Sequence, residues 1–575
     1  MAGSGQPPVV RVLLAVLLAG VLTHLPALGT PFLLDDYLHI SMLEGTFPAA
    51  RGPFDLYDFV NDTDRPVLLE RGILPWWSSP KLKIRFFRPL SSALMWAEHG
   101  VFGNRSLPLH LHSLLWWASA VVAARSLFRR TFSPRVTGIA TLIFAVAPCH
   151  AIPLAWLANR DALVSLAFGT FALAAYVHWR EERSVRHAAL ATILFALSML
   201  GGEYALCFIG YVLAIELVSR GEAFARRVSG VLPFAVPTAL YLAARGALGY
   251  GTAGSGFYSD PLRDPLAFVE HAPVRLVALL GGGWLTIDTI GWGITPAGWV
   301  ALIVIVAFGL AFVPLRRMFA LLGTEQHRAA SWLLVGSVIS LVPVLAVVPS
   351  SRLLGVSYLG VSAVIALFLE YAWFPAVPRM RTGVAELTGL VALMFGYAQL
   401  VQGPVTAWLT GAQLRRGSID FASRTAWVAS QLPDRETASV IVIRGMADMF
   451  FGPFALDPRG AQPARWRTLA HTGHTLVLRK DLRTIELVLR PDRGLYPFQN
   501  NLFRANDAQL SAGSEVILPG MRAKVIAVGA EVPFDVSFEF DRDLDSATFV
   551  WLVENFDGFR AADLPKPGFG LPFDP

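Results

Sequence analysis

The amino-acid sequence predicts a polytopic α-helical membrane protein of about 11 transmembrane helices with a small C-terminal β-rich domain. Three observations lead to this prediction. Of the 575 residues, 54% are hydrophobic and only 16% are charged, whereas about 25% of the residues of a soluble domain are charged. The first 403 residues contain long apolar runs, and crossing a bilayer takes about 20 such residues. After residue 403 the apolar runs are short, alternate with polar residues and end at Gly, Pro or Asp, which is the pattern of β-strands.

The predicted spans follow one another from the N-terminus. The first, 9–28, could be a signal peptide or an uncleaved span. We favour the span, because the apolar core of a signal peptide has only about 7 to 15 residues. The segment 273–291 is apolar but holds three consecutive glycines, and we interpret it as re-entrant or interfacial. The remaining spans are predicted at 108–124, 136–153, 161–178, 187–201, 203–219, 229–247, 294–315, 329–348, 352–373 and 383–402.

Arginines decide the predicted orientation of these spans, because short cytoplasmic loops collect positive charge. Every second connection is rich in Arg, so the N-terminus is predicted in the cytoplasm and the C-terminal domain on the extracytoplasmic side, periplasmic or lumenal. Counting 273–291 as a span would move the Arg316 and Arg317 connection outside. The cytoplasmic connections contain Arg125, Arg129, Arg130 and Arg135, then Arg180, Arg183 and Arg186, then Arg220, Arg226 and Arg227, then Arg316, Arg317 and Arg328, then Arg379 and Arg381.

These assignments divide the chain into predicted domains. The transmembrane domain covers 1–403 and includes two large extracytoplasmic loops, 30–107 with juxtamembrane helices and 248–293. A linker helix is predicted at 404–435, and the β-rich extracytoplasmic domain at 436–575. Its strands are predicted at 439–443, 474–478, 484–489, 523–528, 534–540 and 547–553.

Composition also excludes several classes of function. The net charge of +6 belongs to membrane loops under the positive-inside rule, so no nucleic-acid partner is predicted. Cys149 and Cys207 lie in apolar runs without C-x-x-C spacing, which gives no disulfide framework and no thiolate metal site. No Gly-rich phosphate loop is present, which argues against a nucleotide-driven reaction. We predict no metal and no cofactor, although adjacent acids could hold a divalent ion.

Ionisable residues gather at the predicted extracytoplasmic ends of the spans. Asp35 and Asp36 come directly after the first span. A carboxylate at the boundary between water and lipid can have a raised pKa, which suits a general base acting on a hydroxyl group. Each charge alone could be a solvated loop acid or a snorkelling side chain. Together they predict an anion-and-acid site, and the further members are Arg160, Asp161, Glu203 and Arg352. Arg88 follows Lys81, Lys83 and Arg85 in an extracytoplasmic loop, and this basic cluster is predicted to face phosphate or lipid head groups, with an ordinary interfacial anchor as the alternative.

The order of the motifs around these residues resembles the GT-C superfamily of membrane glycosyltransferases. The likeness covers roughly residues 8–402 and is nearest to the transmembrane O-mannosyltransferases that carry TPR repeats, with the protein O-mannosyltransferases and the aminoarabinose transferases more distant. The sequence departs from the pattern at Gly202, where a Lys is expected before the acid, and in its β-rich domain, which replaces TPR repeats. The motifs are Leu33-Leu34-Asp35-Asp36, Phe87-Arg88-Pro89-Leu90, the segment 109–115, Pro148-Cys149-His150-Ala151, Asn159-Arg160-Asp161-Ala162-Leu163, Gly202-Glu203 and Arg352-Leu353-Leu354.

The resemblance implies a polyprenyl-phosphate-linked sugar as donor and a reactive site on the periplasmic or lumenal face. It implies that Asp35, with Asp36 beside it, is the base that deprotonates the acceptor hydroxyl. Asp161 and Glu203 would shape the pocket for sugar and acceptor, and arginines would neutralise the phosphate leaving group. The substrate-binding residues are then predicted to be Arg88, Arg160, Asp161, Glu203, Arg352 and Tyr358.

We therefore predict an inverting hexosyltransferase of the membrane, with mannose as the candidate sugar. Its acceptor is a hydroxyl group of a protein or an envelope glycan. Two alternatives stay open. A lipid-linked glycan transporter predicts charges deep in the spans together with inverted repeats. A non-catalytic envelope scaffold predicts that Asp35 can be replaced without loss of function. The ionisable groups lie at the mouths of the spans and no repeat is visible in the sequence, which favours the enzyme.

Overall fold

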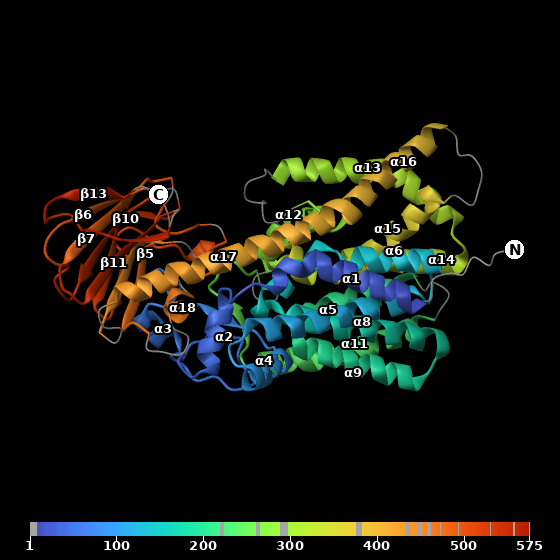
Figure 1. Ribbon diagram of the computed structural model, residues 1–575, viewed down its shortest axis with the longest axis horizontal. Helices are drawn as coiled ribbons and strands as arrows, with labels where there is room; N and C mark the ends of the chain where they lie inside the picture. The colour runs from blue at the N-terminus through green and yellow to red at the C-terminus, as the bar shows by residue number, and fades with distance from the viewer. Residues whose placement is uncertain are drawn as a thin grey trace. The chain divides into compact units, whose positions relative to one another are not determined.

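The computed structural model divides the chain into a helical unit and a β-rich unit (Figure 1). The helical unit comprises 1–31, 87–249 and 261–416, and the β-rich unit comprises 32–86, 250–260 and 417–575. Most of the first predicted loop thus belongs with the C-terminal strands. The structure describes residues 9–218, 223–259, 261, 265–287, 297–374, 382–432, 437–445, 451–456, 462–471, 473–492, 494–498, 500–529, 531–555 and 558–573.

The helical unit confirms the predicted polytopic architecture. Seven helices among the described residues are long and apolar enough to cross a membrane, or eight if the bent pair α6 and α7 is one span. Two shorter apolar helices, α9 and α15, coincide with further predicted spans. The helices are α1 (Val9–Leu28), α4 (Pro89–Phe102), α5 (Ser106–Phe128), α6 (Pro134–Ala145), α7 (Ala151–Ala155), α8 (Asp161–Glu182), α9 (Val185–Gly201), α10 (Ile209–Val218), α11 (Phe224–Ala247), α12 (Pro265–Leu285), α13 (Ala297–Leu321), α14 (Thr324–Ile339), α15 (Tyr358–Trp373) and α16 (Thr382–Tyr397).

Helices α5, α8 and α9 lie side by side within this unit (Figure 1). The segment predicted to be re-entrant begins inside α12, and its part beyond residue 287 lies outside the described residues. Helix α16 continues through a π-helical turn, Ala398–Gln402, into α17 (Gly403–Gln431). The predicted linker is therefore mostly a continuation of the last apolar helix, and the division between the two units falls within α17.

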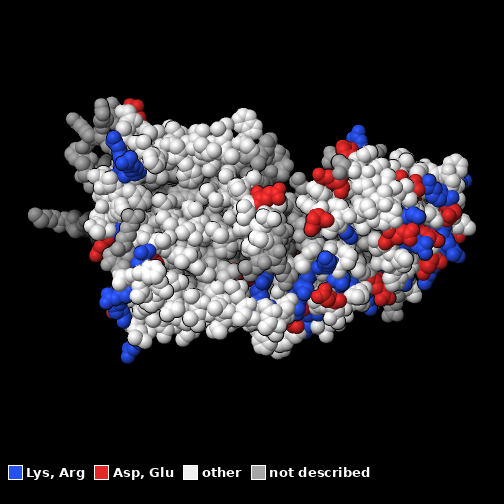
Figure 2. Space-filling view, turned by 180° about the vertical axis from the view of Figure 1, so that it is seen from behind, with Lys and Arg blue, Asp and Glu red and all other residues white. Residues whose placement is uncertain are grey.

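Ion pairs join the helix ends next to three of the connections predicted to be cytoplasmic. Arg130, after α5, forms an ion pair of 2.5 Å with Glu181 near the end of α8. Arg180 of α8 pairs with Glu216 of α10 at 2.8 Å. In Figure 2, Lys and Arg gather at one end of this unit and its middle is nearly free of charge, as expected for a surface in contact with lipid.

The β-rich unit contains three sheets. Strands β1 (Asp58–Val60), β2 (Lys83–Arg85) and β3 (Gly251–Ala253) form a small sheet that joins the two predicted extracytoplasmic loops. The other sheets have the orders β13-β6-β7-β10-β9-β8 and β12-β11-β4-β5. Helices α2 (Asp35–Leu43), α3 (Arg65–Arg71) and α18 (Gly452–Leu456) belong to this unit. The strands are β4 (Ser439–Arg444), β5 (Arg465–Ala470), β6 (Thr475–Arg479), β7 (Thr484–Leu489), β8 (Glu515–Leu518), β9 (Met521–Val528), β10 (Pro533–Phe540), β11 (Phe549–Asn555), β12 (Gly558–Ala561) and β13 (Gly570–Phe573).

Two tryptophans of the first predicted loop are buried in the core of the β-rich unit. Trp76 donates from its indole nitrogen to the Leu469 carbonyl at 2.9 Å. Trp77 stacks on Tyr496, with ring centroids 5.4 Å apart. Large buried aromatic rings contribute strongly to a core, so this loop is an integral part of the unit.

Candidate functional site

Arg88 is the centre of an ion-pair cluster in the helical unit. Its Nη1 lies 3.2 Å from Oδ2 of Asp161, and its Nε lies 3.1 Å from Oε2 of Glu203. The backbone N–H of Phe87 donates to the other oxygen of Glu203 at 3.2 Å. Three predicted extracytoplasmic segments, which are far apart in the sequence, therefore meet through one guanidinium group.

The local backbone structure determines the positions of Asp161 and Glu203. A 3-10 turn, Leu157–Asn159, precedes α8, so that Asp161 occupies the first turn of that helix, where the helix dipole favours a negative charge. Asn159 donates from its amide to Oδ1 of Asp161 at 3.4 Å. Glu203 begins a 3-10 helix directly after α9 and Gly202.

Gly202 packs against the ion pair between Arg88 and Asp161. A Cβ atom at this position would lie 3.1 Å from Oδ2 of Asp161 and 3.5 Å from Nε of Arg88. The resemblance predicts a Lys at this position, whereas in this chain Arg88 supplies the positive charge beside Glu203.

Helix α11 adds two residues that the sequence analysis missed. Nε of Arg245 lies 3.9 Å from Oε1 of Glu203, and the Tyr241 hydroxyl donates to the Phe87 carbonyl at 2.6 Å. Arg245 had a usable signal, since an Arg at a predicted extracytoplasmic helix end runs against the positive-inside rule. Tyr241 had none, because an aromatic residue in an apolar helix is ordinary core.

Arg160 is adjacent to Asp161 but contacts different partners. It forms an ion pair with Glu98 of α4 and donates to the Leu109 carbonyl at 3.1 Å. Glu98 also contacts Nδ1 of His112 in α5. Arg160 and Glu98 are both almost fully buried, so this group ties α4, α5 and the start of α8 together. Glu98 was not predicted as a site residue.

Arg352 and Tyr358 lie near the start of α15. The Arg352 guanidinium is half-buried and lies over the Trp156 ring, 5.4 Å from its centroid. It is also close enough to Asp161 for the two charges to interact. Tyr358 is fully buried, and its hydroxyl has no hydrogen-bond partner among the described residues.

Asp35 and Asp36 begin α2, which belongs to the β-rich unit. Oδ2 of Asp36 accepts a hydrogen bond from the Leu33 backbone at 2.8 Å, and this side chain is buried. Burial and the neighbouring Asp36 charge raise the pKa of Tyr37 to about 12. Leu34, between Leu33 and Asp35, has φ 39° and ψ −108°. This backbone conformation costs of order 1 to 3 kcal/mol for a residue with a Cβ.

Asp35 lines a small cavity in the β-rich unit, about 90 Å³ in volume. Most of the other lining residues are apolar, and they include Phe47, Ile84 and Phe86. The two adjacent acids therefore have different surroundings. Asp36 fixes the turn that precedes α2, whereas Asp35 borders an apolar hollow.

In the described part of the chain, the structure holds no group of three or more His, Cys, Asp or Glu side chains that could bind a metal ion. Asp35 and Asp36 do not form such a group with a third ligand.

Comparisons with known proteins gave matches among solved structures alone. No protein-family model and no curated protein matches the chain. The oligosaccharyltransferase of Archaeoglobus fulgidus, tethered with an acceptor peptide that contains the NVT sequon, is similar at a TM-score of 0.43 and 14% identity, over 80% of this chain and 63% of that chain. The archaeal oligosaccharyltransferase AglB from Archaeoglobus fulgidus, in complex with an inhibitory peptide and a dolichol-phosphate, is similar at a TM-score of 0.42 and 12% identity, over 80% of this chain and 64% of that chain.

ArnT from Cupriavidus metallidurans bound to undecaprenyl phosphate is similar at a TM-score of 0.42 and 13% identity, over 81% of this chain and 86% of that chain. The chain spans less than two thirds of the length of the oligosaccharyltransferase. At these identities and TM-scores the likenesses do not decide the activity, which rests on the residues of this chain.

Proposed function

We propose that the protein is an integral membrane glycosyltransferase of the GT-C type. It transfers a hexose, with mannose the first candidate, from a polyprenyl-phosphate donor to a hydroxyl group of a protein or envelope glycan. The observation that carries this proposal is the cluster around Arg88, in which acids and guanidinium groups from several segments meet at one end of an apolar helical unit.

The arginines of this cluster suit a phosphate leaving group. Arg352 is half-buried, lies over the Trp156 ring and is close enough to Asp161 for their charges to interact. Arg245 lies beside Glu203, on a different segment from Arg88. A guanidinium group can bind phosphate through two parallel hydrogen bonds. It stabilises developing charge most strongly where water is scarce, as at the end of a helix bundle in lipid.

Asp35 is assigned the role of general base. It takes the proton of the acceptor hydroxyl while that oxygen forms a bond to C1 of the sugar. The bond from C1 to the phosphate oxygen breaks on the opposite face, so the configuration at C1 inverts and polyprenyl phosphate leaves. The strained Leu34 before Asp35 supports the assignment, because strained backbone clusters at functional sites.

The test is transfer of radiolabelled sugar in membranes supplied with polyprenyl-phosphate mannose or glucose. Wild type is compared with Asp35→Asn and Arg352→Ala at matched expression. Glu325→Gln and Arg186→Ala are the matched controls, since both residues are exposed and lie in other connections. We expect label to reach an acceptor in wild type and both controls, to be lost in Asp35→Asn, and to fall in Arg352→Ala.

Full transfer by Asp35→Asn would rule out Asp35 as the general base. No transfer by wild type with either donor would favour the scaffold. Movement of intact lipid-linked sugar across the membrane, without release of polyprenyl phosphate, would favour the transporter.

A further inference from the structure

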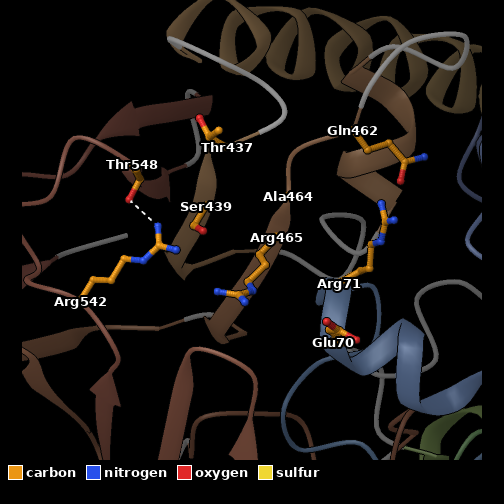
Figure 3. Close-up of a pocket in the computed structure, with 9 residues that line it drawn as sticks. All are labelled: Glu70, Arg71, Thr437, Ser439, Gln462, Ala464, Arg465, Arg542 and Thr548. Carbon is orange, nitrogen blue, oxygen red and sulfur yellow. Dashed lines mark hydrogen bonds between the residues drawn. The ribbon is translucent and has the colours of Figure 1, made fainter.

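The β-rich unit contains a second, larger cavity of about 740 Å³ that is separate from the one beside Asp35 (Figure 3). This volume lies in the range of about 300 to 1,000 Å³ that is typical of small-molecule sites. Its lining is polar and includes the arginines of α3, β5 and the connection between β10 and β11. The lining residues that matter here are Arg71, Arg465, Arg542, Ser439, Thr548 and Gln462.

Sheet topology brings Ser439, Arg465 and Thr548 to the same end of the sheet. Strands β5, β4 and β11 are neighbours and run parallel, so their amino ends lie at one edge of the sheet. Ser439 at the start of β4 is in register with Arg465 of β5 and with Phe549 of β11. Thr548 directly precedes β11. In Figure 3 the Arg465 and Arg542 side chains extend toward the same space beneath Ser439.

The end of α3 is fixed beside this edge, which holds Arg71 in the lining. The buried Arg467 of β5 donates to the Leu69 and Glu70 carbonyls of α3, at 3.0 and 3.1 Å. Gly72, which ends α3, has φ +78° and lies so close to β5 that a Cβ would be 1.5 Å from the Trp466 carbonyl oxygen. The cavity is therefore built by close backbone packing.

The cavity carries excess positive charge. Its described lining residues include three arginines and one acid, Glu70. Outside the lining, Asp541 lies near Arg465: Oδ2 of Asp541 and Nη1 of Arg465 are 3.4 and 2.5 Å from the Cβ position of Gly520. Arg542 donates to the Thr548 hydroxyl, a neutral group, at 3.4 Å. The amide nitrogen of Gln462 is buried and has no hydrogen-bond partner among the described residues. Like charges held together and a buried donor without a partner both cost free energy, and an anionic ligand with acceptor oxygens would relieve both costs.

We propose that this cavity binds an acidic saccharide, that is, a glycan with carboxylate or phosphate groups among its hydroxyls. Guanidinium groups recognise the acidic groups, and the Ser439, Thr548 and Gln462 side chains match sugar hydroxyls in size and polarity. The described lining contains no aromatic ring and no long apolar side chain, so it offers no pocket for the side chains of a peptide. The binding of the saccharide does not depend on the proposed function. Only its role does: if the protein is a glycosyltransferase, the bound glycan is the acceptor.

The test is titration calorimetry on the full-length protein in lipid nanodiscs. The probes are tetragalacturonate for carboxylate, mannose 6-phosphate for phosphate, neutral maltotetraose, and pentaglutamate for an acidic peptide. We expect at least one acidic saccharide to bind at least about tenfold more tightly than maltotetraose. Arg465→Gln and Arg542→Gln should each weaken that binding by about tenfold, as expected for the loss of a charged hydrogen bond.

Arg522→Gln is the matched control, because Arg522 lies on β9 with its side chain about half exposed and outside the cavity lining. Arg542 is itself exposed, so its variant should fold even if Arg465→Gln does not. Equal binding by Arg542→Gln and Arg522→Gln would overturn the site, and so would no binding of either acidic saccharide. Tighter binding of pentaglutamate would assign the cavity to an acidic peptide instead. Asp35→Asn should bind the saccharide as tightly as wild type. Loss of saccharide binding and loss of sugar transfer can therefore be distinguished.

Discussion

At the residue scale, adjacent charged residues contact different partners. Asp36 is buried and holds the turn before α2, while Asp35 borders an apolar cavity. Arg160 joins Glu98, while the adjacent Asp161 joins Arg88. Consecutive residues at the start of a helix point about 100° apart, since the helix has 3.6 residues per turn, so a motif of charged residues need not form a single site.

Arg88 should be far more important for stability than its partners are individually. Arg88→Ala leaves Asp161 buried and without its 3.2 Å ion pair, and breaking such a pair costs about 3 to 5 kcal/mol. Arg88→Lys should recover only part of this, because an ammonium group cannot span both acids as a planar guanidinium does. Adding Asp161→Asn to Arg88→Ala should restore part of the loss.

Thermal unfolding of the purified variants in detergent measures these effects, with Arg186→Ala as the control. An Arg88→Ala protein as stable as wild type would mean that water already screens the cluster.

At the element scale, single glycines allow two elements to pack closely against each other. Gly202 leaves room for Arg88 between α8 and the 3-10 helix at Glu203, and Gly72 lets the end of α3 touch β5. Neither role has a sequence signature, since each depends on a segment that is more than 30 residues away in the chain. Strand β7, by contrast, was predicted at its observed bounds, 484–489, because alternation of apolar and polar residues is a local property.

Gly72→Ala tests the contact between α3 and β5. The new Cβ would lie 1.5 Å from the Trp466 oxygen, at a φ of +78° that disfavours alanine. We expect α3 to shift away from β5, so that both the stability of the β-rich unit and the binding of an acidic saccharide decrease. Gly45→Ala is the control, because Gly45 also has positive φ, +74°, but nothing lies within 4 Å of its Cβ position. Equal effects of the two changes would show that φ, and not the contact, matters.

At the scale of the whole molecule, the sequence predicted the elements better than their grouping. Hydropathy located the apolar helices, and the positive-inside rule sorted their connections, so that the segments holding Arg88, Asp161 and Glu203 were predicted on one side and do meet. The partner of Arg160 could not be predicted, because Glu98 is 62 residues away in an amphipathic helix. The assignment of Trp76 and Trp77 to the β-rich core was also missed, since it depends on tertiary packing with residues near 470 and 496.

Orientation in the membrane can be measured with single cysteines. Cys149 and Cys207 are buried, so they should not react with a membrane-impermeant maleimide. Ala512→Cys, in the β-rich unit, should be labelled on intact cells, whereas Arg186→Cys and Glu325→Cys should be labelled only after permeabilisation. All three positions are exposed, so access to the reagent decides the result.

The pair of cysteines at 186 and 325 also tests the segment around α12. If the segment 273–291 crosses the membrane fully, the connection between α13 and α14 moves to the outside, and Glu325→Cys is labelled on intact cells while Arg186→Cys stays protected. If the segment is re-entrant, both stay protected. Labelling of Arg186→Cys with protection of Ala512→Cys would reverse the orientation of the protein. The cluster around Arg88 would then face the cytoplasm, and a cytoplasmic donor would have to replace the extracytoplasmic one in the proposed reaction.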